Sequence, residues 1–262
     1  MSAVQGRLAG LNAIITGAAS GIGRQTALRF TEEGANIVAA DLSEEGLAAL
    51  KTEIEAAGGV CHTQVTNVSS SADIAALFDL VDEVFDELNC LINNAGITIV
   101  GGVHEISEQD WDREMDINVK SIYLMSRRAW PSLKAARQAV ILNTASIAAT
   151  WAIRNDAAYC ASKAAVAMLT KCMALDGAKD SIRVNCVAPG FIDTPMIHGF
   201  FSNQSDPEAS RAGAIAAHPL GRLGLPSDIA NGFVYLASAD AEWVTGTTLT
   251  VDGGLTAGLW GE

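Results

Sequence analysis

The stretch LNAIITGAASGIG at residues 11–23 decides the fold. It begins with a short apolar run, and three glycines (Gly17, Gly21 and Gly23) follow within seven residues. Glycine allows the backbone to turn tightly and to come close to a ligand, and the amide groups at the start of a helix favour an anion. Because an amphipathic stretch follows at 22–33, the sequence predicts a strand, a phosphate-binding loop and a helix.

The same alternation of apolar run, polar turn and amphipathic stretch continues along the chain. The expected strands are 11–16, 36–41, 60–66, 90–95, 139–146, 182–189 and 247–253. The expected helices are 22–33, 44–57, 72–87, 109–133, 157–178 and 227–237. This order predicts an α/β fold: a Rossmann-like, doubly wound parallel sheet of seven strands with helices on both faces. Ligands then bind beyond the carboxyl ends of the strands.

Nothing in the sequence marks a domain boundary, so residues 1–262 are expected to form a single domain for both dinucleotide binding and catalysis. Only the stretch 195–217 breaks the alternation. Since it is long and follows a strand end, we expect a lid over the crevice, with an ordinary surface insertion as the alternative.

Composition excludes several classes of partner. The 262 residues carry a formal net charge of -13, and a surface of that sign repels nucleic acids and anionic lipid headgroups. No apolar run is long enough for a secretory signal or a membrane span, so a cytoplasmic location is the default expectation. The five cysteines lack the close pairing of a zinc site, which predicts reduced thiols and no metal.

Asp41 ends the second expected strand, eighteen residues after Gly23. An acidic residue near this spacing accepts a hydrogen bond from the adenosine 2′-hydroxyl and repels a 2′-phosphate. The sequence therefore predicts NAD as the cofactor. Arg24 is the one contrary feature, and its alternative interpretation is a surface residue of the first helical turn.

Tyr159 and Lys163 lie four residues apart in a helical segment, so both side chains project from one face. A nearby ammonium lowers the pKa of a phenol toward the range of acid and base catalysis, which makes Tyr159 the expected proton donor and acceptor. Ser146 ends the fifth expected strand, where its hydroxyl could bind the substrate oxygen. Asn118, inside a helix, could also simply bond a neighbouring carbonyl or mark a kink.

These motifs together resemble the short-chain dehydrogenase/reductase superfamily. The resemblance rests on TGAASGIG, on NNAG at 93–96, on Asn118 and Ser146, on YCASK at 159–163 and on Pro189 with Gly190. It implies that Lys163 holds the nicotinamide ribose and that Asn118 completes a proton relay, with catalytic residues Asn118, Ser146, Tyr159 and Lys163. It also implies a homotetramer, with the helices of Asn118 and Tyr159 at the interface.

The cofactor contacts fall around the expected crevice. Beside the glycine loop and Asp41, the resemblance implies contacts from the segments after each strand. The full expected set is Gly17, Ser20, Gly21, Ile22, Gly23, Asp41, Leu42, Asn67, Val68, Asn94, Ala95, Gly96, Tyr159, Lys163, Pro189, Gly190, Ile192 and Thr194.

The chain departs from the family pattern at two places. Asn67 stands where relatives usually present an aspartate to the adenine amino group, although an amide oxygen can still accept that bond. RNDAAY at 154–159 replaces a segment that commonly holds proline and glycine. Because this segment borders the substrate, the specificity of a relative does not transfer.

The expected substrate pocket is mostly apolar. Its residues are Ser146, Ala148, Trp151, Ile153, Tyr159, Phe191, Met196 and Phe200. Trp151 and the two phenylalanines could equally be core or interface residues. The expected substrate is a secondary alcohol or ketone, such as a small or cyclic alcohol, a polyol or a sugar, and the apolar pocket favours an apolar ketone over a sugar.

Two other functions stay open from the sequence. One is reduction of a 3-oxoacyl group on an acyl carrier protein, which the acidic surface and Asp41 disfavour because both the carrier protein and NADPH carry extra negative charge. The other is a nucleotide-sensing binding protein with the same fold and no reaction. The intact set of Ser146, Tyr159 and Lys163 counts against it.

Overall fold

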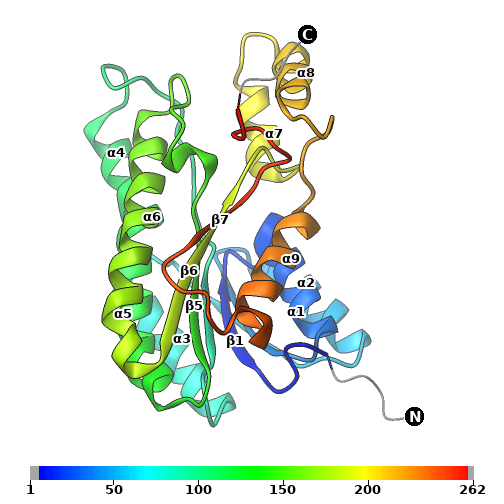
Figure 1. Ribbon diagram of the computed structural model, residues 1–262, viewed down its shortest axis with the longest axis vertical. Coiled ribbons are helices and arrows are strands. Elements are labelled where there is room, and N and C mark those ends of the chain that lie inside the picture. Colours follow the sequence, from blue (N-terminus) through cyan, green and yellow to red (C-terminus); the bar gives the residue numbers. More distant parts are fainter. Residues whose placement is uncertain (1–5, 259–262) are drawn as a thin grey trace.

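Seven parallel strands form one sheet in the order β3-β2-β1-β4-β5-β6-β7 (Figure 1). The computed structural model describes residues 6–258, so the two ends of the predicted domain, 1–5 and 259–262, lie outside the described residues. The strands are β1 Asn12–Thr16, β2 Asn36–Asp41, β3 Cys61–Val65, β4 Cys90–Asn93, β5 Ala139–Thr144, β6 Ile182–Pro189 and β7 Thr248–Val251. The predicted doubly wound sheet is confirmed, because the order reverses between β1 and β4.

Five of the six expected helices have ends shifted by a few residues, whereas the helix expected at 109–133 is divided into α4, a π-helical turn and α5. The observed helices are α1 Gly21–Glu32, α2 Glu44–Ala56, α3 Ser71–Val84, α4 Glu108–Met115, α5 Ser121–Ala135, α6 Ala157–Gly177, α7 Pro195–Ser202, α8 Pro207–Ala217 and α9 Pro226–Ala237. A π-helical turn, Asp116–Lys120, joins α4 to α5. Within residues 6–258, no helix has the length and apolar character needed to span a membrane.

The segment 195–217, for which the sequence predicted no helix, contains α7 and α8. The reason lies at the two helix starts. The side chain of Thr194 accepts from the amide of Ile197, that of Asp206 accepts from Ala209, and a proline begins each helix. Polar caps followed by proline favour helix starts even without a strong apolar period. Its function as a lid stays a prediction.

The sheet lies between two helical layers (Figure 1). Helices α1, α2 and α9 cover one face, and α3, α5 and α6 cover the other. Alternate residues of β1 point to opposite layers: Ile15 packs with Phe30 and Phe233, whereas Ile14 packs with Phe78. All of these side chains are fully buried, so both faces contribute to the hydrophobic core.

The crevice begins where the loops after β1 and β4 meet. The Thr16 hydroxyl accepts from the amides of Asn94 (3.0 Å) and Ala95 (3.1 Å). Gly17 has a φ of +66°, and a Cβ there would lie 2.9 Å from the Cα of Ala95. Only glycine fits this close approach, which joins the two loops at the carboxyl edge of the sheet.

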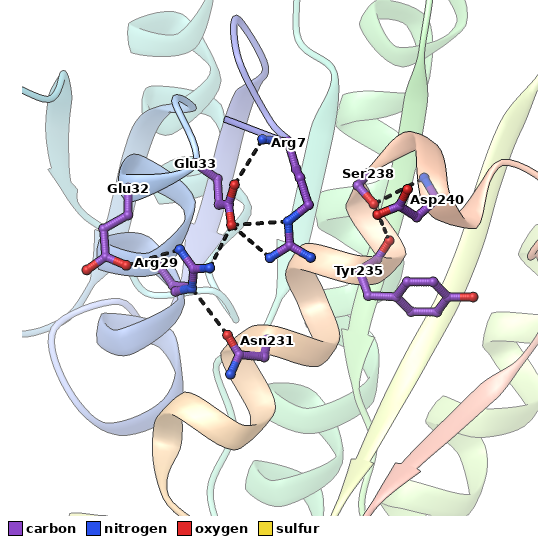
Figure 2. Close-up of polar contacts among 8 residues, drawn as sticks. All are labelled: Arg7, Arg29, Glu32, Glu33, Asn231, Tyr235, Ser238 and Asp240. Carbon is purple, nitrogen blue, oxygen red and sulfur yellow. Dashed lines mark hydrogen bonds and ion pairs between the residues drawn. The ribbon is translucent and has the colours of Figure 1, made fainter. Parts of the chain in front are cut away.

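At the opposite edge, a group of charged residues ties the start of the described chain to two helices (Figure 2). The carboxylate of Glu33 accepts from the Arg7 amide (2.9 Å), the Arg7 guanidinium (2.7 Å) and the Arg29 guanidinium (2.6 Å). Arg29 also reaches Asn231 on α9. These groups hold the pKa of Glu33 down to about 2, chiefly through the hydrogen bonds from Arg7.

Candidate active site

The glycine loop leaves the start of α1 open toward the crevice. Ser20 precedes the helix without a hydrogen bond from its side chain to the first turn, so the helix amides remain available to an anion. A Cβ on Gly23 would lie 2.1 Å from the carbonyl oxygen of Gly17. Gly23 therefore lets the loop close onto the helix, and the geometry fits a pyrophosphate group.

Asp41 lies at the end of β2 beside this loop. One carboxylate oxygen accepts from the amide of Ala19 (3.0 Å) and the other from the amide of Ser43 (3.0 Å). Arg24 points elsewhere and pairs with Glu53 on α2. No arginine lines the cavity among the described residues, and its one lysine, Lys163, lies on α6.

Asn67 also lines the cavity, and its amide oxygen already has partners within the chain. This oxygen already accepts from the backbone amide (3.0 Å) and the hydroxyl (2.7 Å) of Ser69. A carbonyl oxygen has two lone pairs, so the turn at 67–69 uses both of them. A bond from the adenine amino group to this oxygen would compete with the hydroxyl of Ser69, and it stays a prediction.

Helix α6 places Tyr159 and Lys163 on one face, as the spacing predicts. The Lys163 ammonium is buried, donates to the carbonyl of Thr144 (2.8 Å) and lies 5.5 Å from the centroid of the Tyr159 ring. Burial lowers the pKa of Lys163 to about 8, because the charged amine loses water.

The pKa of Tyr159 moves against the prediction. Burial raises it to about 12, and the charges of Asp156 and Glu114 act in the same direction. Lowering of this pKa by Lys163 stays a prediction; the ammonium donates to Thr144 and lies 5.5 Å from the centroid of the Tyr159 ring. The group that does lower the pKa of Tyr159 is Ser146, through a side-chain hydrogen bond.

Ser146 follows β5 and caps a short turn of helix at Ile147–Ala149. Its oxygen accepts from the amide of Ala148 at 3.1 Å. With a lone pair engaged in this way, the hydroxyl hydrogen is oriented for donation to Tyr159 or to a substrate oxygen.

Asn118 lies in the π-helical turn and is 1% exposed. Its oxygen accepts from the amide of Ile97 (2.8 Å), and its nitrogen donates to the carbonyl of Ile97 (2.9 Å) and to Ser162 (3.0 Å). It therefore holds the loop after β4 against α6. The carbonyl that it bonds belongs to the loop after β4 and not to its own helix, and it lies in a π-helical turn between two regular helices.

Most of the predicted residues come together around one cavity of about 370 Å³, a size typical of small-molecule sites. Those that line it are Gly17, Ser20, Gly21, Ile22, Asp41, Leu42, Asn67, Val68, Asn94, Ala95, Gly96, Ser146, Ile153, Tyr159, Lys163, Pro189, Gly190, Phe191, Ile192, Thr194, Met196 and Phe200.

Four predicted residues do not line this cavity: Gly23, Asn118, Ala148 and Trp151. Gly23 and Asn118 lie behind its walls, in the contacts described above. Ala148 is buried in the turn after Ser146, and Trp151 is 45% exposed, so neither is positioned as a pocket residue.

The structure adds pocket residues that the sequence did not predict. Ile97 and Thr98 come from the loop after β4, Ile197 from α7 and Asp156 from the start of α6. Asp156 could have been predicted as a pocket residue, because it belongs to the RNDAAY segment that departs from the family pattern and borders the substrate.

Comparisons with known proteins agree with this geometry. Residues 17–256 match the family described as enoyl-(acyl carrier protein) reductase. The chain is 38% identical to a 3-oxoacyl-[acyl-carrier-protein] reductase of Thermotoga maritima, over 95% of this chain and 99% of that protein. It is 37% identical to a cyclohexanol dehydrogenase of Acinetobacter sp., over 94% of each chain.

A solved structure from Beutenbergia cavernae superposes with a TM-score of 0.89 at 31% identity, covering 96% of this chain and 98% of that one. It is named a putative NAD(P)-dependent gluconate 5-dehydrogenase and holds NADP at low occupancy. The chain belongs to the short-chain dehydrogenase/reductase superfamily and is an oxidoreductase of that fold.

Proposed function

We propose that the protein is an NAD(H)-dependent oxidoreductase that interconverts a secondary alcohol and a ketone. The observation that carries the proposal is the meeting of Ser146, Tyr159 and Lys163 in the cavity that also contains the glycine loop. A phosphate cradle and an acid/base group within one cavity serve cofactor binding and proton transfer together.

The nicotinamide cofactor would supply the hydride chemistry, while the side chains manage the substrate oxygen and its proton. Ser146 donates a hydrogen bond to that oxygen and orients it. Tyr159 gives its phenolic proton to the oxygen in reduction and takes it back in oxidation. Since burial raises the pKa of Tyr159, the structure favours the proton-donating state until a positive charge lies close to the phenol.

NAD is favoured over NADP by the surroundings of Asp41. Its carboxylate lies at the cavity wall next to Leu42, and Arg24 is engaged with Glu53. A 2′-phosphate there would meet a negative charge without a cation to balance it.

A cyclic or otherwise apolar alcohol suits the pocket best. The side chains of Ile97, Ile153, Phe191, Met196 and Phe200 line it, and few fixed donors lie among them. Cyclohexanol and cyclohexadienediol dehydrogenases among the relatives support the same substrate class.

A 3-oxoacyl thioester is the second candidate, because one relative bears that activity in its name. The formal net charge of -13 opposes contact with an acidic carrier protein. A homotetramer and a cytoplasmic location stay predictions, and size-exclusion chromatography with light scattering tests the first of them.

The testing experiment follows absorbance at about 340 nm, where the reduced nicotinamide absorbs, with NAD or NADP and a panel of cyclohexanol, cyclic diols, polyols and 3-hydroxyacyl thioesters. We expect turnover with NAD and a cyclic alcohol, and its loss in Tyr159→Phe with NADH binding retained. Turnover only with NADP and a thioester would establish the second candidate. Unchanged turnover in Tyr159→Phe would refute the mechanism.

A further inference from the structure

A buried carboxyl group with no assigned function lies beside the catalytic residues. Glu114, on α4, is 0% exposed, and neither of its oxygens has a hydrogen-bond partner of normal geometry among the described residues. Such a group is costly to bury, because a carboxylate loses its hydration without compensation. A nearby positive charge could stabilise the Glu114 carboxylate without a direct hydrogen bond.

Two helical faces meet at this point. Glu114 and Asn118 lie one turn apart on α4 and the π-helical turn, and Asn118 bonds Ser162 of α6. On α6, Tyr159 and Lys163 follow Asp156 at three and seven residues, which places all three on one face. Glu114 is thus packed toward the face that carries the catalytic tyrosine and lysine.

The loop after β4 covers this contact. Thr98 donates to the carboxylate of Asp156 (3.0 Å), and the amide of Gly101 donates to the carbonyl of Asn155 (2.7 Å). The amide of Ile99, between these two residues, donates toward Glu114 and favours its charged form. The loop therefore contacts both acidic side chains.

Lys163 lies close to Asn118, the residue one turn after Glu114, because a Cβ on Gly96 would lie 3.1 Å from the Oδ1 of Asn118 and 3.5 Å from the Nζ of Lys163. It is 4% exposed, and burial opposes its protonated form. The negative charge of Glu114 acts in the opposite direction and raises the pKa of Lys163. In return, Lys163 lowers the pKa of Glu114, so the two groups stabilise each other's charged forms.

Charged and titratable groups near Glu114 come from α6, β6, α4 and the loop that precedes α4. They are Asp156, Tyr159, Cys160 and Lys163 of α6, Cys186 of β6, Asp112 and Arg113 of α4 itself, and His104 and Glu105 of the preceding loop. The last four are exposed to solvent, so water screens their charges. Lys163 is the one buried cation in this set.

We propose that Glu114 is a positioning residue whose buried carboxylate serves as the counter-ion of Lys163 and keeps that amine protonated. The proposal rests on the proposed function in one respect, since it assumes that the protonated lysine supports Tyr159. Burial and the charge of Asp156 raise the pKa of Glu114 to about 7, so the counter-ion is charged above neutral pH. Lys163, with a pKa of about 8, then remains protonated in the range where both groups carry charge.

The direct test measures Lys163 itself and needs neither substrate nor cofactor. Protein with lysine ¹³C-labelled at Cε is titrated by NMR from about pH 6 to about pH 10.5, a range that brackets the ordinary pKa of lysine and a lowered one. The Lys163 signal is identified by its loss in Lys163→Met. We expect Glu114→Gln to lower the pKa of Lys163 by at least about half a unit, equivalent to about a threefold change in the ratio of the two forms.

Two matched controls separate this effect from a general loss of negative charge. Asp112→Asn removes an exposed carboxylate from the same helix and should leave the pKa of Lys163 unchanged. Asp156→Asn removes a buried carboxylate whose charge raises the pKa of Glu114. Without it Glu114 is more readily charged, so the pKa of Lys163 should not fall. An unchanged Lys163 pKa in Glu114→Gln, or an equal decrease in Asp156→Asn, would overturn the proposal.

A reciprocal measurement covers the case in which Glu114→Gln does not fold. With glutamate ¹³C-labelled at Cδ, Lys163→Met should raise the pKa of Glu114, because the balancing cation is gone. A Glu114 pKa that stays unchanged would refute the pairing. These titrations are independent of turnover, so their failure is distinct from retained activity in Tyr159→Phe, which would refute the proposed function.

Discussion

Replacing Glu33 by glutamine should destabilise the fold far from the active site. The carboxylate accepts from Arg7 and Arg29 at distances of 2.6 to 3.1 Å, and its side chain is only 12% exposed. Its pKa is lowered from 4.5 to about 2, which corresponds to an upper limit of about 3 kcal/mol in the free energy of unfolding. Since glutamine retains some hydrogen bonds, we expect a loss of about 2 kcal/mol at neutral pH.

The sign of the pH dependence follows from the lowered pKa. The contribution of Glu33 is fully present above the ordinary pKa of 4.5 and is lost as the pH falls toward 2. Linkage gives a loss of about 1 kcal/mol by about pH 4 and about 2 kcal/mol by about pH 3 in the wild type. The difference between the wild type and Glu33→Gln should therefore become smaller over the same range.

Urea unfolding at about pH 7 and about pH 4, followed by circular dichroism, measures this difference. Glu32→Gln is the matched control, because Glu32 is 63% exposed and, within residues 6–258, pairs only with Arg29, at 3.1 Å. We expect that control to lose no more than about 0.5 kcal/mol. If Glu33→Gln costs no more than Glu32→Gln, the group in Figure 2 does not stabilise the fold as the contacts indicate.

Two further predictions concern the cavity. Asp41→Asn should reduce the preference for NAD over NADP at least about tenfold, because the charge that repels a 2′-phosphate is lost. The ratio of the kcat/KM values for the two cofactors measures this preference. An unchanged ratio would contradict the prediction. Ser146→Ala should lower kcat about a hundredfold through loss of the donor to the substrate oxygen. Steady-state kinetics with the alcohol found by the screen tests this, and a kcat within about threefold of the wild type would exclude that function.

The sequence predicted the sheet well because its signals are local. The strand β2 was predicted with its observed bounds, 36–41, since a buried parallel strand is a short apolar run between turn residues. The helices at 195–202 and 207–217 were missed for the opposite reason. Their starts are specified by Thr194, Asp206 and the prolines after them, whereas their few buried side chains give only a weak period.

The geometry of the proposed catalytic segment was also predictable, because the positions of Tyr159 and Lys163 are fixed by the period of a single helix. Its protonation was not, since the pKa of Tyr159 depends on burial by segments distant in sequence. The same holds for Asn67, whose oxygen binds Ser69 in a turn that the spacing of residues does not reveal. Contacts within one helix can be read from spacing, whereas contacts that depend on how loops close cannot.

Burial has opposite consequences for the pKa values of the two groups that we propose to cooperate in proton transfer. It raises the pKa of Tyr159 to about 12 and lowers that of Lys163 to about 8, so it favours the neutral form of both. A neutral amine does not stabilise a phenolate. A site that excludes water would therefore make loss of the Tyr159 proton less favourable. A buried anion such as Glu114 offsets this for Lys163 while raising the pKa of Tyr159, so it favours the phenol as proton donor. Oxidation of an alcohol, which needs the phenolate, should therefore require a higher pH than reduction of the ketone, and pH profiles of kcat that coincide in the two directions would contradict this.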